Sequence, residues 1–206
     1  MASEPPPPSV ADWLSRFSTG SPPLGRAGAA VTIVLRPGAA DVEVLLIERT
    51  ERPSDPASGQ VALPGGHVAE EDGHLGITAL RELAEEVGLE ETDLGGALRY
   101  VGTEHARRFG LNVAVFAAPL GPSSHGAFPK SPEEVAHVFW LPRWVLERTQ
   151  HVHRETGRGL LEVPASVFEG HVVWGFTRRV LRQFFAMSSE DDSLGPVFVP
   201  HGPPSS

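Results

Sequence analysis

The sequence predicts an α+β domain in which helices pack against a mixed β-sheet. Segments typical of strands outnumber segments typical of helices, and the two kinds do not follow the regular alternation of a parallel α/β fold. The chain has 206 residues, about the length of one domain with short extensions. A domain of this size can bury roughly 70% of its unfolded surface, so it needs no disulfide to fold.

The predicted strands are short, rich in β-branched and apolar residues, and bounded by turn residues. Residues 29–35 and 42–47 flank the turn at Pro37-Gly38, which predicts two paired strands. A short strand over 60–63 ends at Pro64-Gly65-Gly66. Further strands are expected over 98–103, 111–118 and 135–141.

Helices are expected in four places. The clearest spans residues 77–87 and ends at Gly88, a residue suited to the position after a helix C-terminus. Its predicted buried stripe consists of Ile77, Leu80, Leu83, Ala84 and Val87. The others are a final helix over 175–187, a short one over 142–147 and a short amphipathic one over 9–17.

The distribution of proline divides the chain into three parts. Six of the 20 prolines lie in residues 1–25 and four in residues 190–206. We therefore expect a Pro-rich N-terminal extension over 1–26, a folded domain over 27–187 and a flexible C-terminal tail over 188–206. Because both ends offer little apolar surface to bury, they are expected to be loosely attached.

Charge and composition exclude several classes of function. Lys and Arg total 17 against 26 Asp and Glu, a net charge of −9 that argues against general affinity for nucleic acid. The absence of cysteine excludes disulfides, thiolate zinc sites and cysteine catalysis. No apolar stretch approaches the ~20 residues of a membrane-spanning helix, and the acidic, Pro-rich start resembles no signal peptide. The expected location is the cytoplasm.

The helix over 77–87 carries Glu82, Glu85 and Glu86 on one face, because residues three and four apart are neighbours on a helix. A solvated surface is the simplest interpretation of such a face. However, the like charges repel, and the Gly65-Gly66 turn upstream could add a backbone carbonyl. Three carboxylates and a carbonyl suit Mg²⁺ or Mn²⁺ better than zinc.

Residues 81–89, Arg-Glu-Leu-Ala-Glu-Glu-Val-Gly-Leu, together with Gly65-Gly66, resemble the Nudix motif of diphosphate hydrolases. That motif ends in Arg-Glu-apolar-x-Glu-Glu-x-Gly-apolar, and every specified position is met. The resemblance covers about residues 28–187 and implies a Nudix-like mixed β-sheet sandwiched by helices. Arg81 follows Gly66 by fifteen residues, one more than the common spacing. The first acidic residue of the motif is therefore one of Glu70, Glu71 and Asp72.

A second set of segments resembles the coenzyme A diphosphatase branch of this family. They are Arg49-Thr50, Gly-Gln-Val-Ala-Leu-Pro-Gly-Gly at 59–66, Thr-Ala-Leu-Arg-Glu at 78–82, Ser-Pro-Glu-Glu-Val at 131–135 and Val-Trp-Gly-Phe-Thr at 173–177. Two positions depart from the branch, where Ala57 replaces a histidine and Leu63 a phenylalanine. The implied substrate is coenzyme A or a derivative, cleaved to 3′,5′-ADP and 4′-phosphopantetheine. The alternatives are ADP-ribose, dinucleotides, nucleoside triphosphates, or binding of a nucleotide without catalysis.

The resemblance and the residue chemistry together assign roles. A Mg²⁺ or Mn²⁺ site is expected from Glu82, Glu85 and Glu86 with the Gly66 carbonyl. The resemblance implies that Arg81 orients these acids by pairing with Glu70 or Glu71, and an ordinary helix ion pair with Glu85 is compatible with that role. Glu82 is the first candidate for the general base, with Glu133 or Glu134 as alternatives from a loop.

Other side chains are candidates for binding or for structure. Arginine suits phosphate groups distant from the metal, and the candidates are Arg49, Arg107 and Arg108. The tryptophans Trp140, Trp144 and Trp174 are interpreted as packing residues. His151 and His153 alternate as on a strand face and are not expected to bind a metal. The expected partner is a small diphosphate substrate, and the sequence leaves open whether the chain forms a homodimer.

Overall fold

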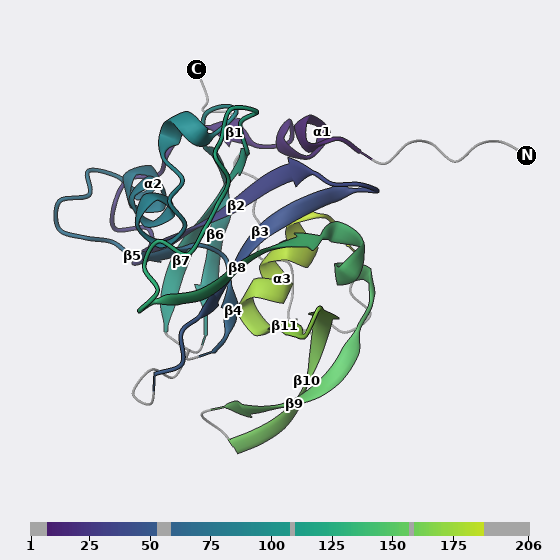
Figure 1. The fold of residues 1–206 in the computed structure, drawn as a ribbon. Helices are drawn as coiled ribbons and strands as arrows, with labels where there is room; N and C mark the ends of the chain where they lie inside the picture. Colours follow the sequence, from purple (N-terminus) through teal and green to yellow (C-terminus); the bar gives the residue numbers. More distant parts are fainter. Residues whose placement is uncertain (1–7, 53–58, 108–109, 157–158, 188–206) are drawn as a thin grey trace, which may run out of the picture.

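The computed structural model describes residues 8–52, 59–107, 110–156 and 159–187. It has a large mixed sheet with α2 on one face and α3 on the other, and a smaller sheet beside α3 (Figure 1). The predicted α+β class is confirmed, as is the arrangement of a mixed sheet between helices. Among the described residues, no helix is long and apolar enough to cross a membrane.

The large sheet has eight strands in the order β1-β6-β7-β2-β3-β4, with β5 paired to β2 and β8 paired to β3. Only the β2–β7 pair is parallel among the pairs of this sheet that the structure describes. The strands are β1 (Ser18–Thr19), β2 (Ala29–Pro37), β3 (Val42–Arg49), β4 (Val61–Ala62), β5 (Gly65–His67), β6 (Arg99–Ala106), β7 (Leu111–Pro119) and β8 (Val135–Pro142). Each strand predicted from the sequence is present with small shifts of its ends.

Successive side chains of a strand point to opposite faces of the sheet. Both faces are buried here, because each face packs against a separate hydrophobic core. On β2, Ile33 and Leu35 belong to the core shared with α3 (Gly175–Phe184), whereas Val34 belongs to the core shared with α2 (Leu75–Glu86). The short 3₁₀ helix η1 (Glu91–Asp93) connects α2 to β6. A second, η2 (Arg143–Glu147), connects β8 to the strand over 150–156 and is the short helix predicted over 142–147.

Helix α2 begins two residues earlier than predicted, and its buried stripe is rotated. Leu75, Ala79 and Leu83 are fully buried, whereas the predicted core residue Ile77 is 41% exposed. These three buried residues are four positions apart, so they lie on one face of the helix, and this face packs on the sheet. Glu86 also lies on the buried side of the helix, which matters for the site described below.

The described part of the N-terminal extension packs against the domain. Helix α1 (Val10–Leu14) places Leu14 in the core, and Trp13 contacts Phe185 edge-on with ring centres 4.9 Å apart. Ser21 accepts a hydrogen bond from the Gly76 amide in the first turn of α2, at 2.8 Å. The prediction of a loosely attached N-terminus is therefore wrong for these residues. Their partners lie far away in the sequence, so no local pattern reveals the contact.

A second sheet of three strands leads into α3. It consists of β9 (Gln150–Thr156), β10 (Gly159–Phe168) and β11 (His171–Trp174) in the order β11-β10-β9. Only the alternation of His151 and His153 indicated a strand here, and β10 and β11 were not predicted. The hairpin of β9 and β10 extends away from the large sheet (Figure 1). The predicted C-terminal tail over 188–206 lies outside the described residues.

Candidate active site

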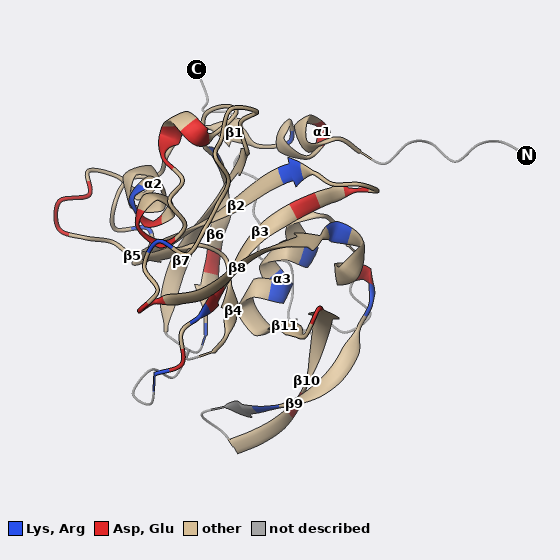
Figure 2. Cartoon of the chain, viewed as in Figure 1, with Lys and Arg blue, Asp and Glu red and all other residues tan. Residues whose placement is uncertain are grey.

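Arg81 on α2 is at the centre of a network of acidic side chains. Its Nη1 donates to Glu82 Oε1 at 2.8 Å and to Glu85 Oε2 at 3.0 Å. On its other side, Nη2 donates to Asp72 Oδ2 at 3.1 Å and to the His67 carbonyl at 2.9 Å. The guanidinium therefore fixes α2 relative to the loop that follows β5, and Figure 2 shows acidic and basic positions together on α2.

Of the three acids in the loop before α2, Asp72 pairs with Arg81, and neither Glu70 nor Glu71 does so. The Asp72 carboxylate is buried and also accepts hydrogen bonds from Thr78 Oγ1 at 2.8 Å and the Ala69 amide at 2.9 Å. These bonds, above all those from Arg81, lower the pKa of Asp72 to about 2. Glu70 and Glu71 are exposed. The expected pairing of Arg81 with one of them is wrong, because the extra residue in this loop brings position 72 to the arginine.

Glu82 lies against Gly66. A Cβ atom placed on Gly66 would come within 2.4 Å of Glu82 Oε1, so only glycine permits this approach. Gly65 is constrained too, with φ at +150° and the Ala30 carbonyl 2.2 Å from where its Cβ would lie. Burial raises the pKa of Glu82, and the bond to Arg81 opposes the rise. The double glycine thus brings backbone and carboxylate together as the sequence motif predicts.

Glu86 is the most deeply buried acid of the helix, at 2% exposure. Its Oε2 accepts a hydrogen bond of 2.8 Å from the Gly65 amide. Burial, with smaller contributions from the charges of Glu82 and Glu134, raises its pKa to about 8, although the Gly65 bond and Arg49 oppose the rise. Glu86 is therefore a carboxyl group whose charged form lacks sufficient compensation in the metal-free protein.

The predicted metal ligands fit a divalent cation in their chemistry but do not form a finished site. Among the described residues, no three acidic or histidine side chains are grouped closely enough to hold a metal ion. Glu85 is exposed and bound by Arg81, while Glu86 faces Gly65. Burial raises the pKa values of Glu82 and Glu86, and a bound cation would stabilise the charged forms of these two carboxylates.

The segment before β8 brings Glu134 to this group. The Ser131 hydroxyl donates to the Glu85 carbonyl at 3.0 Å, and the Lys130 amide donates to the Glu86 carbonyl at 3.1 Å. Glu134 consequently lies near enough to raise the pKa values of both Glu82 and Glu86. Such proximity is what a loop residue with a catalytic role requires. Glu133 is the other loop candidate, and its backbone carbonyl accepts a hydrogen bond from the Arg52 side chain.

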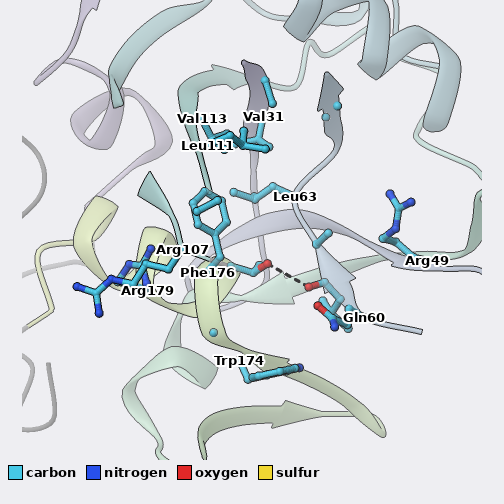
Figure 3. Close-up of a pocket in the computed structure, with 18 of the residues that line it drawn as sticks. Val31, Arg49, Gln60, Leu63, Arg107, Leu111, Val113, Trp174, Phe176 and Arg179 are labelled. Carbon is cyan, nitrogen blue, oxygen red and sulfur yellow. Dashed lines mark hydrogen bonds between the residues drawn. The ribbon is translucent and has the colours of Figure 1, made fainter. Parts of the chain in front are cut away.

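A pocket of about 390 Å³ opens beside Gly65 and Gly66. Arg49 and Arg107, both predicted to bind phosphate, line it from different sides (Figure 3). Arg49 is also close enough to Glu86 to lower its pKa. Arg108, the third predicted arginine, lies outside the described residues. The structure thus brings two candidate phosphate-binding residues and the double glycine into one cavity.

Further residues of this pocket were not predicted. They come from the residue before β4, from β11 and from α3, and include Gln60, Trp174, Phe176, Thr177 and Arg179. Trp174, interpreted from the sequence as a packing residue, lines the pocket wall. The Thr177 hydroxyl donates to the Val61 carbonyl at 3.0 Å, joining α3 to β4 (Figure 3). The motif-like segments over 59–66 and 173–177 were the available signals, and the second marks where α3 meets the pocket.

Comparison with known proteins identifies the family. A NUDIX domain model matches residues 26–160, so the chain belongs to the Nudix hydrolase family, whose enzymes cleave diphosphate bonds and generally use divalent metals. An uncharacterized Nudix hydrolase NudL of Yersinia enterocolitica is 28% identical over 85% of this chain and 91% of its own. The mitochondrial coenzyme A diphosphatase NUDT8 of Homo sapiens is 32% identical over 73% of this chain and 70% of its own.

Solved structures agree on the fold. A MutT/nudix family protein from Enterococcus faecalis superposes with a TM-score of 0.53 at 18% identity, covering 87% of this chain and 69% of the other. A MutT protein from Methanosarcina mazei gives a TM-score of 0.51 at 17% identity, covering 77% of this chain and 91% of the other. The predicted resemblance to Nudix hydrolases is confirmed, both by sequence and by fold.

Proposed function

We propose that this Nudix hydrolase cleaves coenzyme A or a derivative to 3′,5′-ADP and 4′-phosphopantetheine. One observation carries the proposal: a single pocket joins the double glycine of the motif to arginines and aromatic rings. A bulky substrate with a diphosphate, a base and a further phosphate needs this combination of groups. The likeness to the NUDT8 enzyme supports the same substrate class.

We assign Glu82, Glu85, Glu86 and the Gly66 carbonyl as ligands of Mg²⁺ or Mn²⁺. The bound metal would neutralise diphosphate oxygens and lower the pKa of a water molecule. Arg81 keeps Glu82 and Glu85 in place from one side and is itself held by Asp72. Gly65 orients Glu86 through its amide. The ligands are thus positioned by backbone and by one guanidinium.

Proton removal from the attacking water is assigned to Glu82 or Glu134. Glu82 is half-buried and carries a raised pKa, which makes its carboxylate a better proton acceptor than an exposed glutamate. Glu134 is exposed and lies close enough to influence Glu82 electrostatically. Substitution of each by glutamine separates the two: the pH profile of kcat should change for the residue that accepts the proton.

The substrate is tested by a screen of wild-type protein with Mg²⁺ and with Mn²⁺. Coenzyme A, ADP-ribose, dinucleotides and nucleoside triphosphates are compared by kcat/KM, with products identified by chromatography. We expect coenzyme A to give the highest kcat/KM and to release 3′,5′-ADP. Efficient cleavage of ADP-ribose with none of coenzyme A would overturn the substrate assignment. Binding of these compounds without turnover would instead identify a binding module.

Location and assembly remain predictions from the sequence. The cytoplasm is the expected location, and fractionation of the source cells tests it. A homodimer is one of the states that the sequence leaves open, and light scattering of the purified protein decides between the states.

A further inference from the structure

Arg179 on α3 contributes a guanidinium to the pocket from outside the Nudix motif. Its Nη2 lies 3.4 Å from Glu104 Oε2 and donates to the His105 carbonyl at 3.0 Å. Its guanidinium carbon lies 5.6 Å from the centre of the Phe176 ring. A carboxylate, a carbonyl and an aromatic ring therefore hold this side chain at the pocket wall.

Glu104 on β6 is a costly residue for a strand interior. It is fully buried, and within the described part of the chain its carboxylate makes no hydrogen bond of good geometry beyond the 3.4 Å ion pair with Arg179. Burial of a carboxylate in this state is unfavourable unless a cation compensates it. The positive charges that act on it come from Arg179, Arg107 and His105. A buried acid that faces these side chains serves to keep Arg179 in place.

Arg107 follows directly after β6 and is exposed at the pocket mouth. In Figure 3 it lies beside Arg179, whereas Arg49 lies on the opposite side of the pocket. Leu63, Val31 and Phe176 separate the two sides. The cavity consequently has arginines on two sides with apolar side chains between them. Arg49 is close enough to Glu86 of α2 to lower its pKa, so the Arg49 side adjoins the acids of that helix.

We propose that Arg107 and Arg179 form a second anion site, which binds a phosphate monoester on the part of the substrate remote from the cleaved diphosphate. Guanidinium pairs suit the three oxygens of a phosphate monoester. This inference rests on the proposed function, because it takes the diphosphate to bind beside Gly66 and Arg49. The ligand class is a nucleotide with an additional phosphate on its ribose. Glu104 is a positioning residue that acts through Arg179.

Binding of products to metal-free protein tests this site without hydrolysis. Calorimetry in EDTA compares adenosine 3′,5′-bisphosphate with 5′-AMP, and inorganic phosphate serves as a third probe. Wild-type protein should bind the bisphosphate at least about tenfold more tightly than 5′-AMP, as expected for one charge-assisted contact. Tight binding of phosphate alone, with no preference between the two nucleotides, would overturn the proposal.

Four variants locate the preference. Arg107→Gln should reduce the ratio of the two affinities about tenfold and leave the melting temperature unchanged, because Arg107 is exposed. Arg179→Gln removes the ion pair of the buried Glu104 and is expected to destabilise the fold. The double variant Glu104→Gln/Arg179→Gln removes both charges and should fold, again with a reduced ratio. Arg36→Gln removes one positive charge on β2, outside the pocket lining, and should keep the wild-type ratio.

Retention of the wild-type ratio in either Arg107→Gln or the double variant would overturn the second anion site. Loss of the preference in Arg36→Gln would also overturn it, since the effect would then come from net charge. Failure of wild-type protein to cleave coenzyme A is a separate result, which contradicts the proposed function and leaves the nucleotide binding measurement unchanged.

Discussion

Glu86→Gln should stabilise the metal-free protein at alkaline pH while removing its activity. The carboxyl is 2% exposed, and its pKa rises from 4.5 to about 8 because burial disfavours the charged form. A group whose folded-state pKa is raised contributes stability below its unfolded pKa and loses it as the pH rises through the folded value. Wild-type stability should therefore fall between about pH 4.5 and pH 8 through Glu86. Glutamine keeps an oxygen that can accept the Gly65 amide bond and carries no charge.

The size of the effect follows from the two pKa values. Each tenfold difference in proton affinity corresponds to about 1.4 kcal/mol, so the advantage of Glu86→Gln over wild type should grow by about 2–3 kcal/mol between pH 6 and pH 9. Urea unfolding in EDTA at pH 6, 7, 8 and 9 measures this difference directly. The other titrating groups affect the unfolding free energy of both proteins alike, so their contributions cancel in the difference.

The matched control is Glu85→Gln on the same helix. Glu85 is exposed, so its replacement should change stability by less than about 0.5 kcal/mol at every pH. Both variants should lose kcat by orders of magnitude if both acids bind the metal. If the difference in unfolding free energy between Glu86→Gln and wild type did not change with pH, the raised pKa of Glu86 would be refuted. Near-wild-type turnover of either variant would refute its role as a metal ligand.

Three further predictions follow from the same geometry. Asp72→Asn breaks the buried pair with Arg81 and should cost about 3 kcal/mol in urea unfolding, whereas Glu71→Gln, an exposed neighbour, should cost almost nothing. Gly66→Ala places a Cβ against the Glu82 carboxylate, so kcat should fall at least tenfold with circular dichroism unchanged, and unaltered turnover would disprove the close approach. Leu14→Ala should lower unfolding free energy by about 2–5 kcal/mol, and a change below about 0.5 kcal/mol would show that α1 does not dock on the core.

The fold was largely predictable because its strands carry local patterns. The β-branched runs that become β2, β3 and β7 are visible in the sequence, as is the Gly88 end of α2. The strands β10 and β11 were missed, since β10 contains Pro164 and mixed polar residues without a clear alternation. The docking of α1 was missed because Trp13 contacts Phe185, a residue about 170 positions further along the chain.

The site was predictable to the extent that the motif is local. Glu82, Glu85 and Glu86 share one helix, and Gly65-Gly66 lies in the strand that a short loop connects to this helix. Asp72 could not be selected over its two acidic neighbours, because the choice depends on how an inserted residue shapes the loop.

Arg179 could not be found from the sequence at all. It reaches the pocket only because α3 packs beside β6, a contact between residues about 70 positions apart. Nothing in its immediate neighbours distinguishes it from a surface arginine, and its role depends on the buried Glu104.

We propose that the acids of α2 bind a divalent metal that is required for hydrolysis. Calorimetric titration of Mn²⁺ into wild-type protein, Glu82→Gln and Glu71→Gln tests it most directly. We predict that wild type and Glu71→Gln bind Mn²⁺ with equal affinity, and that Glu82→Gln binds it at least about tenfold more weakly. Equal affinity of Glu82→Gln and wild type would contradict the claim.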